Sequence, residues 1–121
     1  MKLPGPDHPI TIVPNTKRVR VTFGGEVVAD TTQALNLKEA SYPAVLYIPR
    51  ADAKMDLLKK TDNATHCPYK GDAAYYTIKV DGREAENAIW SYETPFPAMQ
   101  EIAGHLAFYP NRVDAIETTA G

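Results

Sequence analysis

The chain's only cysteine, Cys67, lies in the segment THCPYKGDAAYY, residues 65–76, among residue types that can do chemistry. A cysteine thiolate beside a base can act as a nucleophile. His66 is adjacent, but neighbouring side chains of an extended chain point to opposite faces, so His8 and His105 are the better candidate bases. One hypothesis is therefore an enzyme that uses Cys67 as a nucleophile or redox residue. The alternative for a lone cysteine is a small buried hydrophobic residue.

The same segment offers a cation next to a permissive backbone, Lys70 followed by Gly71. Such a pair can bind an anion or a small polar ligand. Arg50, at the end of the predicted strand AVLYI (44–48), is a second cation at a position where binding residues often lie. Neither lies in a phosphate-binding GxxxxGK[ST] motif, and solvent exposure is the alternative for both. The spacing of the cysteine and the histidines matches no metal motif, so we expect no metal and no cofactor.

Size and composition indicate one globular domain. The chain has 121 residues, of which 44% are hydrophobic and 23% charged, and its ten prolines and seven glycines favour many turns. A net charge of −2 gives no general attraction to nucleic acid. No apolar run approaches the roughly 20 residues that span a bilayer, and the N-terminus has no apolar core of signal-peptide length. We expect a cytoplasmic protein with neither nucleic acid nor membrane as a partner.

The pattern along the chain predicts a mainly β, α+β domain of antiparallel hairpins with two short helices. Residues 1–17 form a proline-rich arm that we expect to pack on the domain, 18–117 form the domain, and 118–121 form a disordered tail. The helices are predicted within residues 50–60, where Asp56 and Lys60 are spaced to pair, and within residues 94–110.

The first hairpin turns at Gly24 and Gly25. A two-residue loop pairs Phe23 with Glu26, Val21 with Val28, and Val19 with Asp30. Asp30 would then lie at the end of an apolar face. A shifted register, or a carboxylate that caps the next segment, is the alternative, because sequence does not determine loop length.

The second hairpin turns at Asp81 and Gly82. A regular ladder pairs Val80 with Arg83, Ile78 with Ala85, Tyr76 with Asn87, Tyr75 with Ala88, and Ala73 with Trp90. One face is then charged near the turn and aromatic at the far end, where Tyr75, Trp90 and Tyr92 meet the segment of Cys67.

Aromatic walls beside a cation are typical of a site for a polar-headed small molecule. We predict a pocket for a small anionic or planar ligand between the segment of residues 67–71 and the aromatic end of the hairpin. The predicted binding residues are Arg50, Cys67, Tyr69, Lys70, Gly71, Tyr75, Trp90 and Tyr92. A packed aromatic core is equally compatible with this pattern, and a homodimer that uses a strand edge or the aromatic patch is a third interpretation.

A set of ordered motifs resembles a known family. The motifs are PGPDHPI, SYPAVLYIPRAD with MDLL shortly after it, CPYKGDAAYY, AENAIWSYETP and IAGHLAFYPNRVD, and the resemblance runs from about residue 3 to residue 117. They are similar to the Domain of Unknown Function 427 family, whose members are small and mostly bacterial. The residues that match the family pattern are Tyr47, Arg50, Cys67, Tyr69, Lys70, Gly71, Tyr76, Trp90 and Tyr92.

The resemblance implies a small mainly-β domain of the Mss-four-like or β-tent group, and it implies no established activity. Some relatives in that group bind zinc through two pairs of cysteines, which this chain lacks. The family also carries a nucleotidyltransferase-type label. The carboxylates in this sequence are scattered, without the cluster that holds magnesium beside phosphates.

Overall fold

Three antiparallel sheets make up the structure, a computed structural model that describes residues 1–120. The first sheet contains β1 (Ile10–Pro14), β4 (Leu35–Glu39) and β5 (Val45–Tyr47), and the second contains β10 (Ala115–Thr119), β2 (Arg18–Phe23) and β3 (Glu26–Thr31). The third contains β6 (Leu58–Cys67), β7 (Gly71–Val80), β8 (Arg83–Ser91) and β9 (Ala107–Phe108). The helical segments are the 3-10 turns η1 (Arg50–Asp52), η2 (Met55–Leu57), η3 (Pro97–Ile102) and η4 (Pro110–Arg112). The mainly β fold is confirmed, and its likeness to the β-tent group stays a prediction.

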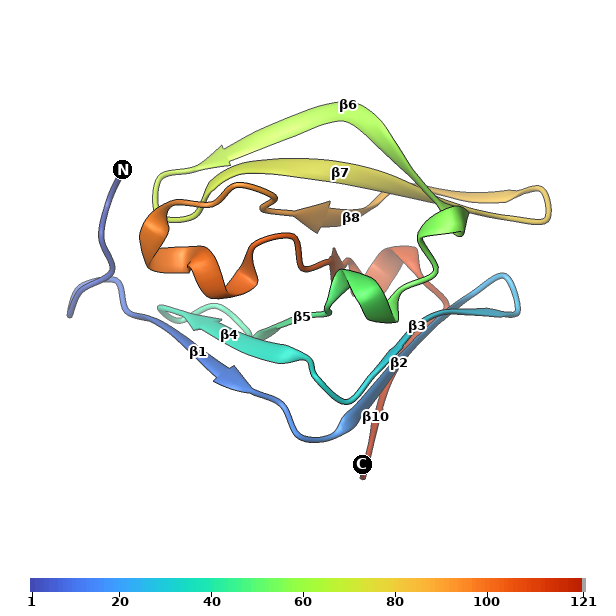
Figure 1. Ribbon diagram of the computed structural model, residues 1–121, viewed down its shortest axis with the longest axis horizontal. Helices are drawn as coiled ribbons and strands as arrows, with labels where there is room; N and C mark the ends of the chain where they lie inside the picture. The colour runs from blue at the N-terminus through green and yellow to red at the C-terminus, as the bar shows by residue number, and fades with distance from the viewer. Residues whose placement is uncertain (121) are drawn as a thin grey trace.

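The sheets form two layers, as Figure 1 shows: β6, β7 and β8 lie in the upper layer, and β1 to β5 with β10 lie in the lower layer. The segment from η3 to η4 runs between them. A pair of backbone hydrogen bonds, each 2.8 Å long, joins Ile48 at the end of β5 to Leu106 before β9. These bonds tie the two layers together beside the site described below.

The first hairpin turns at Gly24 and Gly25, both with positive φ, but its register changes at a bulge next to Val21. Beyond the bulge Val21 pairs with Ala29, and Asp30 moves opposite Arg20. The predicted pairs of Val21 with Val28 and of Val19 with Asp30 are therefore wrong, and the shifted register is correct. Asp30 accepts hydrogen bonds from the Arg18 guanidinium at 2.8 and 2.6 Å instead of ending an apolar face.

The second hairpin keeps the predicted pairs near its turn and loses them at a bulge around Asn87. Asn87 has a φ of 48°, and its amide donates to Oγ1 of Thr77 at 3.1 Å. Past the bulge the pairs are Tyr76 with Ile89, Tyr75 with Trp90, and Ala74 with Ser91, so the predicted partners of Tyr75, Tyr76 and Trp90 are wrong. The shift amounts to two residues, and because side chains alternate with a period of two, each keeps its predicted face.

The helix predicted for residues 50–60 is present only as two separate 3-10 turns, and its last three residues are strand. The turns η1 and η2 are followed directly by β6, in which Lys60 pairs with Tyr76 across the ladder. Its ammonium binds Glu93 at 2.6 Å, not Asp56. Pairing with β7 outweighs local helix preference in this segment. The second predicted helix is present as η3, which is a 3-10 segment with Pro97 in its first turn.

The termini belong to the sheets more than predicted. Residues 10–14 of the N-terminal arm form β1, which pairs with β4 along its whole length. The predicted tail of residues 118–121 is partly strand, because β10 extends to Thr119. Residue 121 of that tail lies outside the described residues.

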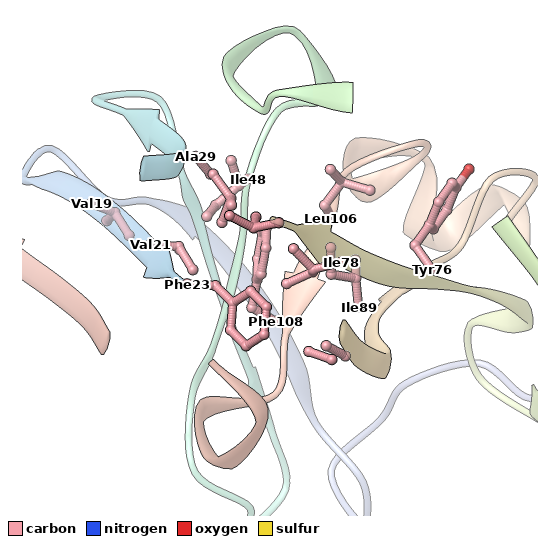
Figure 2. Close-up of a cluster of buried hydrophobic side chains, with 14 of the residues drawn as sticks. Val19, Val21, Phe23, Ala29, Ile48, Tyr76, Ile78, Ile89, Leu106 and Phe108 are labelled. Atoms are coloured by element: carbon pink, nitrogen blue, oxygen red, sulfur yellow. The ribbon is translucent and has the colours of Figure 1, made fainter. Parts of the chain in front are cut away.

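Two apolar clusters fill the space between the layers. Figure 2 shows the first, where Val21, Ile48 and Phe108 converge from different strands. The second cluster holds Tyr47, Tyr75 and Tyr92 together with smaller residues. The alternation of β5 and β7 divides side chains between the two clusters: Ile48 and Tyr76 face the first, whereas Tyr47 and Tyr75 face the second.

Candidate functional site

A cavity of about 270 Å³ lies at the edge of the second cluster. The first sheet contributes side chains of β4 and β5, among them Glu39 and Tyr47. The opposite wall is built by Lys70, Tyr75, Trp90, Tyr92 and Tyr109. Tyr42 and Pro43, in the loop between β4 and β5, form an exposed rim.

Lys70 brings a positive charge into this aromatic surrounding. It is the last residue of the turn between β6 and β7, and only 7% of its surface is exposed. Its carbonyl accepts a 3.0 Å hydrogen bond from the amide of Phe96, which fixes the turn against the segment before η3. Its ammonium donates to Glu39 and lies 5.7 Å from the centre of the Tyr92 ring. Glu39 and Tyr92 therefore hold the ammonium at the cavity wall, by charge and by the ring face respectively.

Glu39 has both oxygens engaged. Oε1 accepts from Lys70, and Oε2 lies 2.7 Å from Nε2 of His8. Burial works to raise the pKa of Glu39, but hydrogen bonds and charge from Lys70 and His8 outweigh it, and the pKa lies below its usual range. Glu39 is thus an ionised residue with one partner from the chain on each of its oxygens.

The aromatic wall is ordered by contacts around Trp90. The indole N–H of Trp90 donates to the Tyr47 hydroxyl at 3.3 Å, and the Tyr109 ring lies 4.5 Å away, tilted by 48°. Tyr75 shares a 3.0 Å hydrogen bond with the Thr65 hydroxyl across the β6–β7 ladder. These contacts hold the ring faces that border the cavity in fixed positions.

Tyr92 presents a hydroxyl with no hydrogen-bond partner among residues 1–120. The Tyr92 side chain lines the cavity. Burial raises the pKa of Tyr92 above its usual range. Burial, together with neighbouring Tyr75, raises the pKa of Tyr109 to about 12. At neutral pH these phenols are therefore protonated and able to donate.

Arg50 does not belong to the cavity, contrary to the prediction that it meets the ligand with Lys70. Its guanidinium contacts the Tyr76 hydroxyl at 3.1 Å and Glu93 at 3.1 Å, on the other face of β7 and β8. A further bond of 3.2 Å reaches the Gly104 carbonyl. Arg50 thus ties η1 to the third sheet, and its charge is balanced by Glu93.

Cys67 is half-buried and packs against the second cluster. Neither candidate base lies within hydrogen-bond reach of its sulfur: His8 contacts Glu39, and Nδ1 of His105 lies 3.3 Å from the Ala103 carbonyl. Tyr69 stacks on His8, with ring centres 4.0 Å apart, and Gly71 has a φ of 111°. Lys70, Tyr75, Trp90 and Tyr92 are therefore the predicted residues that line one cavity.

The predicted binding residues leave out seven that line the cavity, namely Leu37, Glu39, Tyr42, Pro43, Val45, Tyr47 and Tyr109. The short apolar strand around Tyr47 was identified, but nothing in the sequence indicated which strand it would face. Glu39 lies 31 residues before Lys70, and no local spacing connects them.

A model of the family described as "Domain of unknown function (DUF427)" matches residues 11–119 of the chain. No curated protein matches the chain. Within residues 1–120 no group of three or more His, Cys, Asp or Glu side chains is arranged to hold a metal ion. None of the helices described there is long and apolar enough to cross a membrane.

Proposed function

The chain belongs to the DUF427 family, a domain of unknown function, and on that premise we propose that it binds a small planar molecule with an anionic group in the cavity beside Lys70. The observation that carries the proposal is the buried ammonium of Lys70 at the wall of an aromatic cavity. Buried lysines almost always have a partner of opposite charge. Here the partner is Glu39, which takes one of the three N–H groups of the Lys70 ammonium.

The anionic group is favoured by the balance of donors and acceptors. Lys70 has three N–H groups and gives one to Glu39, and the hydroxyl of Tyr92 has no partner among the described residues. Both oxygens of Glu39 already accept hydrogen bonds or face a histidine nitrogen. A ligand group rich in acceptors, such as a carboxylate, therefore matches the cavity better than one rich in donors.

The planar part is favoured by the walls and the rim. The rings of Trp90 and Tyr109 line the cavity, and the ring of Tyr42 lies at its mouth, 62% exposed. An aromatic ligand ring stacks on such surfaces in an offset or edge arrangement. The cavity of about 270 Å³ is near the lower end of the range for small-molecule sites, which favours a ligand with one ring.

Benzoate is a suitable probe, because it joins one planar ring to one carboxylate. Trp90 is the chain's only tryptophan, so its indole N–H gives a single, assigned NMR signal at the cavity wall. We expect benzoate to shift this signal in a saturable manner at pH 7. Benzamide, which has the same shape without the charge, is expected to bind at least tenfold more weakly.

Two variants test the site. Lys70→Met keeps the alkyl stem and removes the charge, and we expect a loss of benzoate affinity of about tenfold or more. Tyr92→Phe removes one hydroxyl, and we expect a loss of about threefold to tenfold. Lys79→Met is the matched control, because Lys79 forms an exposed pair with Glu84 away from the cavity. Benzoate affinities equal to wild type in both Lys70→Met and Tyr92→Phe would show that the proposed site is wrong.

A further inference from the structure

A second cavity of about 300 Å³ lies next to the first. Its floor contains Val21, Ile48 and Phe108, which converge in the first apolar cluster in Figure 2. Ala44 and Pro110 line it as well and are exposed, so they mark its mouth. We call this cavity the apolar lobe, and the cavity beside Lys70 the polar lobe.

The two lobes meet at residues that they have in common. Val45 and Trp90 line both. On one wall the chain passes from Pro43, in the polar lobe, to Ala44, in the apolar lobe, within one residue. On the other wall Tyr109 lines the polar lobe, while its neighbours Phe108 and Pro110 line the apolar lobe. The lobes are therefore adjacent, and Val45 and Trp90 lie at the boundary between them.

The chemistry of the lobes is opposite. The side chains of the apolar lobe are hydrocarbon except for the Trp90 indole, and its one N–H already donates to Tyr47 at 3.3 Å. A ligand's charged group gains no partner from side chains there, whereas methylene groups leave water at a gain of about 0.8 kcal/mol each. The polar lobe holds the ammonium of Lys70 and the tyrosine hydroxyls. A molecule that occupies both lobes must be polar at one end and apolar at the other.

We infer that the two lobes form one site, and that its ligand is an amphipathic acid whose carboxylate lies at Lys70 and whose apolar tail passes Trp90 into the apolar lobe. The inference rests on the proposed function and extends it to a ligand class. The ring of the ligand lies against Trp90, and the tail leaves the ring on the side opposite the carboxylate. This orientation follows from the lining of the lobes, because Lys70 lines only the polar lobe, Phe108 and Ile48 line only the apolar lobe, and Trp90 lines both.

The test is a series of benzoates that carry an unbranched 4-alkyl group of one to six carbons. Each added methylene that enters the apolar lobe is expected to raise affinity about fourfold, until the lobe is filled and the gain stops. The binding of each acid is followed at the Trp90 indole signal and checked by calorimetry. Benzoate that binds with no gain from the tail would overturn the inference and leave the proposed function standing, whereas no binding by any acid would overturn both.

Ala44→Trp places a bulky ring at the mouth of the apolar lobe, and Ala44→Ser is its matched control. We expect the gain per methylene to vanish in Ala44→Trp and to remain in Ala44→Ser. An unchanged gain in Ala44→Trp would mean that the tail binds elsewhere, and the inference would be wrong. Sedimentation of the same samples tests whether a second copy of the chain occupies the apolar lobe instead. If Ala44→Trp dissociates a dimer, and the affinity of wild type does not rise with the length of the alkyl group, the lobe is a contact between copies and the inference is wrong.

Discussion

At the level of single residues, Glu39 is the main partner that compensates the buried positive charge of Lys70. The Lys70 ammonium is almost fully covered, and Glu39 supplies the opposing charge. The Tyr92 ring adds a weaker attraction through its face. A buried ion pair of this kind stabilises little relative to an apolar pair of equal size, but removal of one member leaves the other charge uncompensated.

Glu39→Gln is therefore expected to lower the free energy of unfolding by about 1–3 kcal/mol at pH 7. The pKa of Glu39 in the folded chain lies below its ordinary value of 4.5, so its ionised form stabilises the fold above that pH. This stabilisation is lost as the pH falls below 4.5 and through the lower pKa of the folded chain. Urea unfolding of wild type and variant should show a difference that is largest at pH 7 and shrinks on acidification.

Glu84→Gln provides the control for that experiment, because Glu84 forms an exposed pair with Lys79. Its effect should stay within about 0.5 kcal/mol at every pH, as surface ion pairs contribute little. A difference between wild type and Glu39→Gln that grows as the pH falls would contradict the assigned direction of the Glu39 pKa.

At the level of elements, the turn between β6 and β7 positions Lys70 through the backbone of Gly71. Gly71 has a φ of 111°, a region that residues with a Cβ avoid. A Cβ there would lie 3.5 Å from the backbone of Pro95 and Phe96, which is ordinary contact, so the cost of Gly71→Ala comes from the backbone alone. We expect a loss of about 1–3 kcal/mol in stability and weaker benzoate binding, because the turn moves Lys70 when it relaxes.

Gly5→Ala is the comparison for Gly71→Ala, because a Cβ at Gly5 meets nothing within 4 Å. Thermal unfolding of that variant should match wild type to within a degree or two. If Gly71→Ala is as stable as Gly5→Ala and binds benzoate as wild type does, the turn does not depend on this glycine.

The elements also show which parts of the site could be predicted from sequence. The turns at Gly24–Gly25 and at Asp81–Gly82 were predicted, since two adjacent residues of a turn type carry that signal locally. The bulge at Asn87 was not, because it depends on a hydrogen bond to Thr77 in the facing strand. The shared face of Tyr75 and Trp90 nevertheless survived, since a shift of two residues preserves alternation.

Strand β6 was missed for a related reason. Its sequence, LKKTDNATHC, is polar and has an exposed edge, so it lacks the apolar alternation of a half-buried strand. Its pairing is supplied by β7, which is buried along most of its length. A polar edge strand is defined by its neighbour, and no single-segment pattern can indicate it. Lys70 could be predicted because a lysine followed by a glycine is a local signal, whereas the strand that precedes it depends on pairing with β7.

At the level of the whole molecule, the site exists only when distant parts of the chain meet. Glu39 and Tyr47 come from the first sheet, Trp90 comes from the third, and Lys70 comes from the turn that joins β6 to β7. The hydrogen bonds between Ile48 and Leu106 join these two layers at the edge of the cavity. The cavity therefore forms only when the two layers are assembled. A ligand that binds there binds only the folded chain, so it should stabilise the whole domain by mass action.

Residues 1–9 of the N-terminal arm contact Glu39 and the turn between β6 and β7. A deletion of these residues removes all of those contacts together. His8 approaches Glu39 at 2.7 Å and stacks on Tyr69, and the amide of Lys2 donates to the Pro68 carbonyl at 2.7 Å. These contacts converge on the turn that carries Lys70, whereas β1 begins only at Ile10. We therefore expect the deletion to leave the sheets intact, lower stability by about 1–2 kcal/mol and speed amide hydrogen exchange in residues 69–71.

His8→Ala, compared with the deletion, separates the two sources of order in this turn. The point variant removes the contact to Glu39 and the stacking on Tyr69, but it retains the backbone bond between Lys2 and Pro68. We expect it to reproduce most of the lost stability but only part of the faster exchange, because the backbone bond still restrains the turn. Exchange in residues 69–71 that stays at the wild-type rate in the deletion would mean that the turn is ordered by the segment before η3 alone, through the bond from the Phe96 amide to the Lys70 carbonyl.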